Sequence, residues 1–311
     1  MAKKSETFRQ LIARTEKLPP LVTAVVHPCD PESLRGAVIA QRRNLIRAVL
    51  VGPEHKIRRA AAAARLSIRD CEIVSTEHSH AAAETAVRLV REQRVECLMK
   101  GSLHTDELVS AVVDAGKGLR TSRRISHVFV LDVPAYPRAL LVSDAAINIS
   151  PDLETKCDIV QNAIDLAHAL RIDRPRVAIL SAVETVTPKI PSTIDAAALC
   201  KMADRGQITG AILDGPLAFD NAISEAARRV KRIESTVAGR PDILVVPDLE
   251  AGNMLVKTLQ YLSGAKTAGI VLGARVPIAL TSRADTVQSR LASAAIAVLL
   301  HHTRHSGRLV S

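Results

Sequence analysis

The chain has 311 residues, of which 47% are apolar, a composition typical of a globular protein with a sizeable core. Its net charge of +10 favours an anionic partner, but the chain lacks Trp and only 2% of its residues are aromatic, which argues against the stacking surfaces of single-strand nucleic-acid binders. The apolar runs are too short to cross a bilayer and the N-terminus lacks a signal core. We therefore expect a cytoplasmic protein that acts on small anions, with no nucleic-acid or membrane partner.

The first part of the chain alternates between strand-like and helix-like segments. After a polar opening helix, strand-like runs lie at residues 21–27, 46–52, 71–75 and 96–100, and helical spacing of apolar residues marks 31 to about 44, a segment from 53 onwards, and 81–94. Such βαβ alternation predicts a mainly parallel sheet with helices on both faces.

The alternation is interrupted between residues 116 and 143. Segment 116–124 is polar and rich in Gly and Arg, which predicts a loop, and the runs 125–133 and 138–143 follow with no helix between them, which predicts a hairpin. After residue 152 the alternation returns, with helices to about 170, at 193–204 and near 218–230, and strands at 176–180, 210–213 and 243–246. We expect an α/β fold of two domains with mainly parallel sheets, divided near residues 148–151.

The junction between a strand-like run and the last helix is a candidate anion site. The apolar run stops at Thr281, a helical pattern begins about four residues later, and Ser282 and Arg283 lie between them. Unpaired N–H groups and the helix dipole attract an anion to such a junction, and a guanidinium suits phosphate. A structural alternative stays open, because Asp285 followed three residues later by Gln288 is typical of a capping box.

Polar or Gly-rich residues follow several of the other predicted strands. Ligands of open α/β sheets bind at the carboxyl ends of strands, so we expect these residues to contact the substrate: Lys100, Gly101, Asp144, Asn148, Asp214, Gly215, Pro216, Asp248, Gly252 and Asn253. In the loop at 116–124, Arg120, Arg123 and Arg124 would clamp a phosphate, and a solvated, mobile loop is the equal alternative.

Several common chemistries lack their sequence signatures. The five cysteines are scattered without the spacing of a disulfide framework or a zinc site, and the histidines near 78–80 and 301–305 suit at most weak metal binding. The chain has no G-x-G-x-x-G, no P-loop and no G-x-S-x-G, so neither a dinucleotide, a Walker-type ATP site nor an α/β-hydrolase is supported. Ser282 is therefore better suited to hydrogen-bonding a substrate than to attacking it.

Four motifs together resemble the phosphate acetyltransferase and phosphate butyryltransferase family. They are Asp-Ala-Ala-Ile-Asn at 144–148, Asp-Gly-Pro-Leu-Ala-Phe-Asp at 214–220, Pro-Asp-Leu-Glu-Ala-Gly-Asn at 247–253 and Thr-Ser-Arg at 281–283. The similarity extends from about Gly52 to about Val298, and segments 100–105, 118–127 and 182–192 look closer to the butyryl branch.

The resemblance implies an acyltransferase that reversibly moves a short acyl group, acetyl or butyryl, from acyl-CoA to inorganic phosphate. Coenzyme A is then a substrate, and no cofactor or metal is implied. The family's architecture implies a cleft between two domains, residues 1–148 completed by a C-terminal helix at 283–311 and residues 149–282, in a homodimer or other homo-oligomer.

The resemblance also implies roles for single residues. The family's Ser-Arg pair, matching Ser282 and Arg283, holds the coenzyme A sulfur and stabilises charge on the reacting acyl group. The aspartate that acetyltransferases place seven positions after that serine is Ser289 here, and Tyr261 stands in place of an arginine that contacts coenzyme A. These departures favour a butyryl-type or divergent enzyme and leave the general base open. The alternatives are a catalytically weak acyl-CoA-binding or regulatory module and a dehydrogenase of the isocitrate or isopropylmalate type.

Overall fold

The structure, a computed structural model, describes residues 7–282 and 285–306. The chain divides into two compact units, which we name after one residue in each. The Ser282 unit comprises Phe8–Arg123 and Ala268–Ser311, and the Asp144 unit contains Arg124–Thr267. Within the described ranges, none of the helices is both long and apolar enough to cross a membrane.

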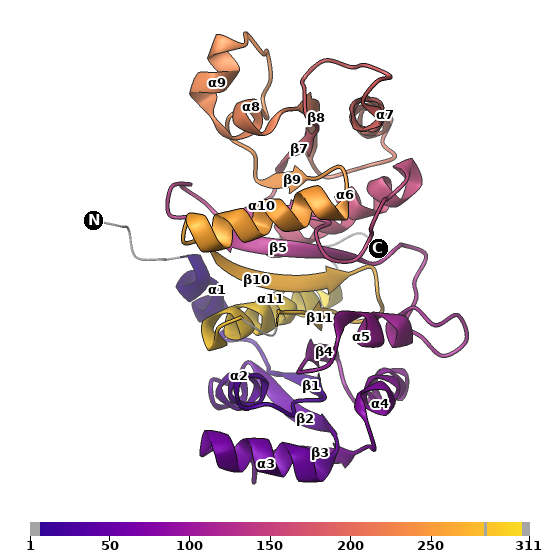
Figure 1. The fold of residues 1–311 in the computed structure, drawn as a ribbon, viewed down its shortest axis with the longest axis vertical. Coiled ribbons are helices and arrows are strands. Elements are labelled where there is room, and N and C mark those ends of the chain that lie inside the picture. The colour runs from indigo at the N-terminus through magenta and orange to yellow at the C-terminus, as the bar shows by residue number, and fades with distance from the viewer. Residues whose placement is uncertain (1–6, 283–284, 307–311) are drawn as a thin grey trace. The chain divides into compact units, whose positions relative to one another are not determined.

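The Ser282 unit is built on a mostly parallel sheet (Figure 1). The strand order is β3 (Glu72–Ser75), β2 (Ile46–Gly52), β1 (Leu21–Val26), β4 (Cys97–Lys100), β11 (Ile278–Ala279) and β10 (Lys266–Leu272). The first five strands run parallel, and β10 pairs antiparallel with β11. Because Val26 pairs with Lys100 and Ala279 with Met99, β1, β4 and β11 end at the same edge of the sheet.

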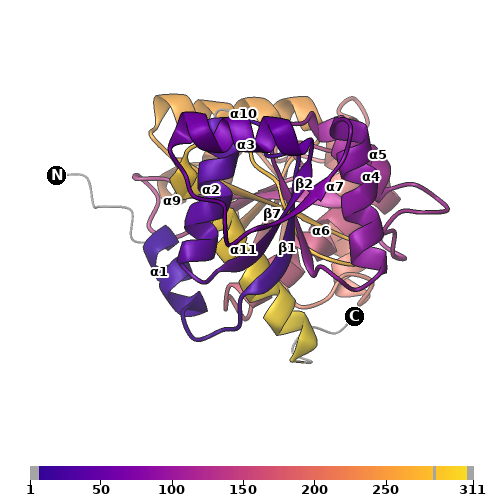
Figure 2. The same ribbon diagram turned by 90° about the horizontal axis from the view of Figure 1, so that it is seen from below.

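Helices cover both faces of this sheet (Figure 2). They are α1 (Thr7–Thr15), α2 (Pro31–Arg42), α3 (Glu54–Ala64), α4 (Ser79–Arg91), α5 (Thr105–Val112) and α11 (Val287–His305). One buried cluster joins α2, α3 and α11 through Leu34, Ile57 and Leu291, whereas α4 and α5 pack together on the other face. The residues just beyond β1, β4 and β11 therefore lie at an edge that is flanked by helices.

The Asp144 unit has the strand order β5 (Ser126–Asp132), β6 (Leu140–Ser143), β9 (Ile243–Val245), β7 (Arg176–Leu180) and β8 (Ile212–Leu217). β5 and β6 form the antiparallel hairpin that the sequence predicts, and the other pairs are parallel. Its helices are α6 (Leu153–Ala169), α7 (Pro191–Asp204), α8 (Phe219–Ile223), α9 (Glu225–Val230) and α10 (Leu249–Leu262). The α/β class and the mainly parallel pairing expected from the sequence are confirmed.

Two element boundaries expected from the sequence are wrong. The strand expected at 210–213 runs from Ile212 to Leu217. β8 is an edge strand and its register with β7 shifts between Ala178 and Leu180, a setting in which a proline such as Pro216 is tolerated. The single helix expected near 218–230 is divided into α8 and α9 at Ser224, whose side chain accepts the N–H of Ala227 and begins α9. The domain boundaries expected at 148/149 and 282/283 stay predictions. The two compact units are defined by contacts alone, which do not test which segments form a domain.

Candidate active site

The carboxyl ends of β1 and β4 are joined by main-chain hydrogen bonds. Gly101 donates its N–H to the carbonyl of Val26 at 2.9 Å, and Ser102 donates to that of His27 at 2.9 Å. A Cβ on residue 101 would lie 2.4 Å from the Val26 oxygen, so this approach requires glycine. Lys100, only 3% exposed, is thereby held at the edge where β11 also ends.

The cysteine beside this edge is not an activated nucleophile. Burial raises the pKa of the Cys29 thiol to about 11, and burial likewise raises the pKa values of Cys97 and Cys200 to about 12. These thiols stay protonated at neutral pH, so none of the three offers the thiolate that covalent catalysis needs.

Beyond β11, the turn at Ser282 is held by two buried charged side chains. Asp285, 7% exposed, accepts the Ser282 N–H through Oδ2 at 2.6 Å, and its own N–H donates to the Ser282 carbonyl at 3.1 Å. Arg290, 3% exposed, donates from Nη2 to the same carbonyl at 3.2 Å and from Nη1 to the Thr281 hydroxyl at 3.0 Å. Ser282 itself is exposed, and Arg283 lies outside the described residues.

The structure corrects the capping role expected for Asp285. The N-cap of α11 is Thr286, whose hydroxyl accepts the N–H of Ser289 at 3.2 Å, so the capping box of Asp285 and Gln288 is wrong. Asp285 instead closes the Ser282 turn. Ser289 is buried in the first turn of α11, with its hydroxyl 3.3 Å from that of Thr286, and it brings no carboxylate to this position.

Sequence reasoning missed Arg290. Burial lowers the pKa of its guanidinium, and the charges of Asp30 and Asp285 oppose that shift. Its side chain crosses α2 at Gly36, where a Cβ would lie 2.6 Å from the Arg290 Cδ. The sequence held one signal for Arg290, since it directly precedes the apolar run 291–300. An arginine beside so apolar a helical segment is buried only when it has polar partners.

The arginine-rich loop is held by hydrogen bonds that involve both side chains and the main chain. A Cβ on Gly118 would lie 2.4 Å from the Asp114 oxygen, and the Asp114 carboxylate accepts two N–H groups of the loop. Arg120 forms an isolated bridge with Ala274, and its Nε donates to the carbonyl of Val113. These bonds tie residues 114–120 together, and both the phosphate clamp and the mobile-loop alternative stay predictions.

In the Asp144 unit, α6 holds the main chain of Arg124 from two sides. The Arg124 N–H donates to Oδ2 of Asp158 at 2.8 Å, and its carbonyl accepts from Nδ2 of Asn162 at 3.0 Å. Asn162 is 1% exposed and also donates to Ser126, which anchors the start of β5. The exposed Arg124 side chain therefore projects from a fixed main chain, and its neighbour Arg123 is half-buried.

Asp144 organises the loop after β6. Its carboxylate accepts the N–H groups of Ala146, Ile147 and Asn148 and the Asn148 amide, the last at 2.6 Å. Burial raises the pKa of Asp144, although these four hydrogen bonds favour the charged form. Asn148 also donates to the carbonyl of Ile125, so the loop is tied to the start of the hairpin.

Two of the sequence motifs meet at Ala145. Gly252 of α10 packs so closely that its Cβ would lie 2.8 Å from the Ala145 Cβ, and Asn253 donates to the Ala145 carbonyl at 3.2 Å. Asp248 is the N-cap of α10 and accepts the Ala251 N–H at 2.8 Å. The structure thus brings together the residues predicted at 144–148 and 248–253. Their contact with a substrate stays a prediction.

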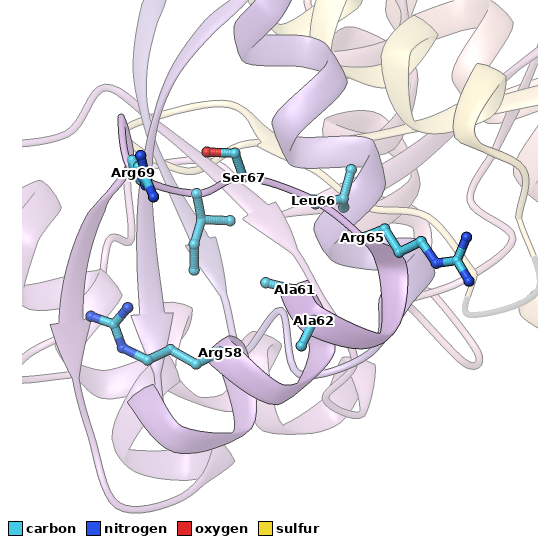
Figure 3. Close-up of a pocket in the computed structure, with 8 residues that line it drawn as sticks. Arg58, Ala61, Ala62, Arg65, Leu66, Ser67 and Arg69 are labelled. Carbon is cyan, nitrogen blue, oxygen red and sulfur yellow. The ribbon is translucent and has the colours of Figure 1, made fainter.

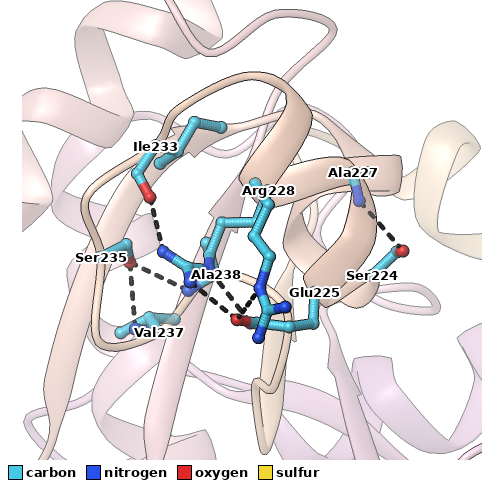
Figure 4. A network of polar contacts seen from close by, with 9 residues as sticks. Ser224, Glu225, Ala227, Arg228, Ile233, Ser235, Val237 and Ala238 are labelled. Carbon is cyan, nitrogen blue, oxygen red and sulfur yellow. Dashed lines mark hydrogen bonds and ion pairs between the residues drawn. The ribbon is translucent and has the colours of Figure 1, made fainter.

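The third motif is placed differently from the expectation. Asp214, Gly215 and Pro216 lie within β8 rather than after it, and a Cβ on Gly215 would lie 2.8 Å from Ile179. Asp214 lines a hollow together with residues 234–236. Figure 4 shows a polar network beside this segment, in which Arg228 contacts both the Glu225 carboxylate and the carbonyl of Ile233, the latter at 2.8 Å.

A second hollow, in the Ser282 unit, is lined by three arginines that do not point toward one common position. It is lined by Arg58, Arg65 and Arg69, but Figure 3 shows Arg65 directed away from the other two. Arg58 is also ion-paired with Glu54 at 2.6 Å. Across residues 7–282 and 285–306, no group of three or more His, Cys, Asp or Glu side chains is placed to hold a metal ion.

Comparisons with known proteins point to one family. Residues 77–298 match the family described as phosphate acetyl/butaryl transferase. The chain is 62% identical to a phosphate acetyltransferase of Rhizobium meliloti, covering 98% of this chain and 96% of that protein. It is 40% identical to a phosphate butyryltransferase of Clostridium beijerinckii, covering 95% and 98%. A branched-chain phosphotransacylase from Enterococcus faecalis V583 has a similar structure, with a TM-score of 0.78 at 30% identity over 91% of this chain and 99% of that one.

Proposed function

We propose that this chain, which belongs to the phosphate acetyl/butyryl transferase family, is a phosphate acyltransferase that moves an acyl group between acyl-CoA and inorganic phosphate. A phosphate oxygen attacks the thioester carbonyl, the carbon–sulfur bond breaks, and coenzyme A leaves as a thiolate that takes up a proton. The observation that carries this proposal is the Ser282 turn. It presents an exposed serine whose main chain is hydrogen-bonded to two buried charged side chains, at the carboxyl edge of a parallel sheet.

The chemistry asks for positioning more than for proton transfer. Phosphate is already anionic near neutral pH and can attack the carbonyl itself, provided that cations offset its repulsion from coenzyme A. Charge then develops on the carbonyl oxygen and on the leaving sulfur, and each donor aimed there is worth about 3 kcal/mol by analogy with oxyanion holes. Ser282 and Arg283 would be those donors, with Arg120, Arg123 and Arg124 drawing in phosphate.

We infer a ternary complex without a covalent enzyme intermediate and without a cofactor. The protonated Cys29 thiol supports this, because it offers no thiolate to attack the acyl group. As donor we propose acetyl-CoA, because the relatives at higher identity are named phosphate acetyltransferases and those at lower identity phosphate butyryltransferases. The expected closeness to the butyryl branch is thus supported only in part. By family resemblance we also propose a cytoplasmic homo-oligomer.

The test is release of free coenzyme A thiol from acetyl-CoA, propionyl-CoA and butyryl-CoA, each with and without phosphate. We expect release that depends on phosphate and is fastest with acetyl-CoA, and Ser282→Ala should lower it. Faster release from butyryl-CoA would overturn the acetyl preference alone. Acyl-CoA binding by calorimetry without any thiol release would instead favour the regulatory module.

A further inference from the structure

We propose that Asp285 and Arg290 are positioning residues that jointly fix the main chain of Ser282 for acyl transfer. The inference rests on the proposed function and deepens it, since it concerns how that site is held. Neither residue was expected to take part in the reaction: Asp285 was a candidate helix cap, and Arg290 had no assigned role.

The first support is that both main-chain groups of Ser282 are occupied. The N–H donates to Asp285 at 2.6 Å, and the carbonyl accepts from the Asp285 N–H at 3.1 Å and from Arg290 at 3.2 Å. A residue between a strand and a helix would otherwise be among the more mobile parts of a fold. With these three bonds Ser282 stays exposed to substrate while its main chain cannot turn freely.

The second support is the chemistry of the partners. Hydrogen bonds to ionised groups are roughly twice as strong as neutral ones, and burial keeps water from competing for them. Arg290 directs both terminal nitrogens of its buried guanidinium to this turn, Nη1 to the Thr281 hydroxyl at 3.0 Å and Nη2 to the Ser282 carbonyl at 3.2 Å. The charged end of the side chain is therefore used to hold residues 281 and 282.

The third support is the space that α2 leaves for Arg290. Gly36 lies inside a 12-residue helix, where glycine is unfavourable. A Cβ there would meet Arg290 Cδ at 2.6 Å and Cβ at 3.2 Å. Gly36→Ala should therefore displace the guanidinium without removing any charged group, which makes it a test that is independent of the loss of a charge.

The experiment is steady-state kinetics with acetyl-CoA and phosphate for Arg290→Met, Asp285→Asn and the double variant. Each single substitution should lower kcat ~100-fold and change the acetyl-CoA KM by less than ~3-fold, because substrate contacts remain while alignment is lost. The double variant should be at most ~3-fold slower than the slower single variant, since either change already frees Ser282. Arg290→Lys, which can replace one of the two donated bonds, should recover part of kcat, and Gly36→Ala should lower kcat several-fold.

A matched control is Arg138→Met, which removes an arginine paired with Asp242 at 3.2 Å at the amino ends of β6 and β9. Its kcat should stay within ~2-fold of the wild type. Circular dichroism and the melting temperature establish that each variant is folded. Near-normal kcat in folded Arg290→Met or Gly36→Ala, or losses that multiply in the double variant, would overturn the positioning role. A wild type that releases no thiol would instead refute the proposed function.

Discussion

The main chains of Ser282 and Arg124 are held by the same pattern of hydrogen bonds but by partners of different kinds. Each gives its N–H to an aspartate and receives a side-chain donor at its carbonyl. The partners of Ser282 lie 3 and 8 residues away, within one turn and the start of α11, and both are charged. Those of Arg124 lie 34 and 38 residues away on α6, and one is a neutral amide.

This difference in sequence separation shows which parts of the fold must be in place to hold each residue. The Ser282 turn forms from residues close in sequence, so it is largely complete once α11 has begun and docked on α2. Arg124 is held only after α6 has packed on the hairpin, because neither Asp158 nor Asn162 is near it in the chain. We therefore expect substitutions at the turn to act on the rate of chemistry, and substitutions on α6 to act on phosphate binding.

The largest expected effect is at the turn itself. Arg283→Ala should lower kcat by ~100-fold or more, because it removes the cation that we propose stabilises the negative charge developing during transfer. Stopped-time assays of thiol release at saturating substrates measure this, and circular dichroism should show an intact fold. Turnover close to that of the wild type would remove Arg283 from the mechanism and leave the turn without its main donor.

A smaller effect is expected from α6. Asp158→Ala and Asn162→Leu should each raise the phosphate KM ~10-fold with kcat changed less than ~3-fold, because in the proposed clamp a freed Arg124 would hold phosphate less well while the turn is untouched. Initial rates over a range of phosphate concentrations give both constants. Glu154→Ala, an exposed change on the same helix, is the control and should alter neither. A loss in kcat with an unchanged phosphate KM would contradict the division of roles.

The smallest expected effect is on stability rather than on turnover, and it concerns His301 near the end of α11. Burial first, then the charge of His305, lowers the pKa of His301 to about 4. As the pH falls through about 6.5, His301 binds a proton in the unfolded chain but not in the folded chain. The free energy of unfolding therefore decreases by roughly 1 kcal/mol when the pH is lowered from 6.5 to 5.5. Urea unfolding at both pH values should show this loss, and it should shrink in His301→Gln. The exposed His55→Gln is the control, and an equal loss in both variants would contradict the assignment.

Local sequence patterns predicted much of the fold. Period-2 and helical spacing predicted most of the strands and helices, and the absence of a helix between 133 and 138 predicted the β5–β6 hairpin. The same reasoning ended β8 too early, because Asp-Gly-Pro is the usual composition of a turn and only the neighbouring strand shows that the chain continues in the sheet. It also joined α8 to α9, since a break at one serine leaves the apolar spacing almost unchanged.

The candidate site was predictable as a set of strand ends but not as a set of contacts. Gly101, Gly215 and Gly252 mark positions where main chain or a neighbouring side chain approaches too closely for a Cβ, which a sequence shows only as glycine. Asp144 and Asp248 proved to organise a loop and a helix start. Both roles suit an aspartate at a strand end, so the residue type alone did not separate scaffold from substrate contact.

By itself the sequence determined the α/β class, the hairpin and the ordered motifs of the acyltransferase family, because periodicity and short motifs are local properties of the chain. Only the tertiary structure decided that Asp285 and Arg290 hold Ser282 and that Asp158 and Asn162 hold Arg124. The direction of a side chain and the main-chain group that it reaches depend on how helices pack on the sheet. That packing is set by burial summed over residues far apart in the chain.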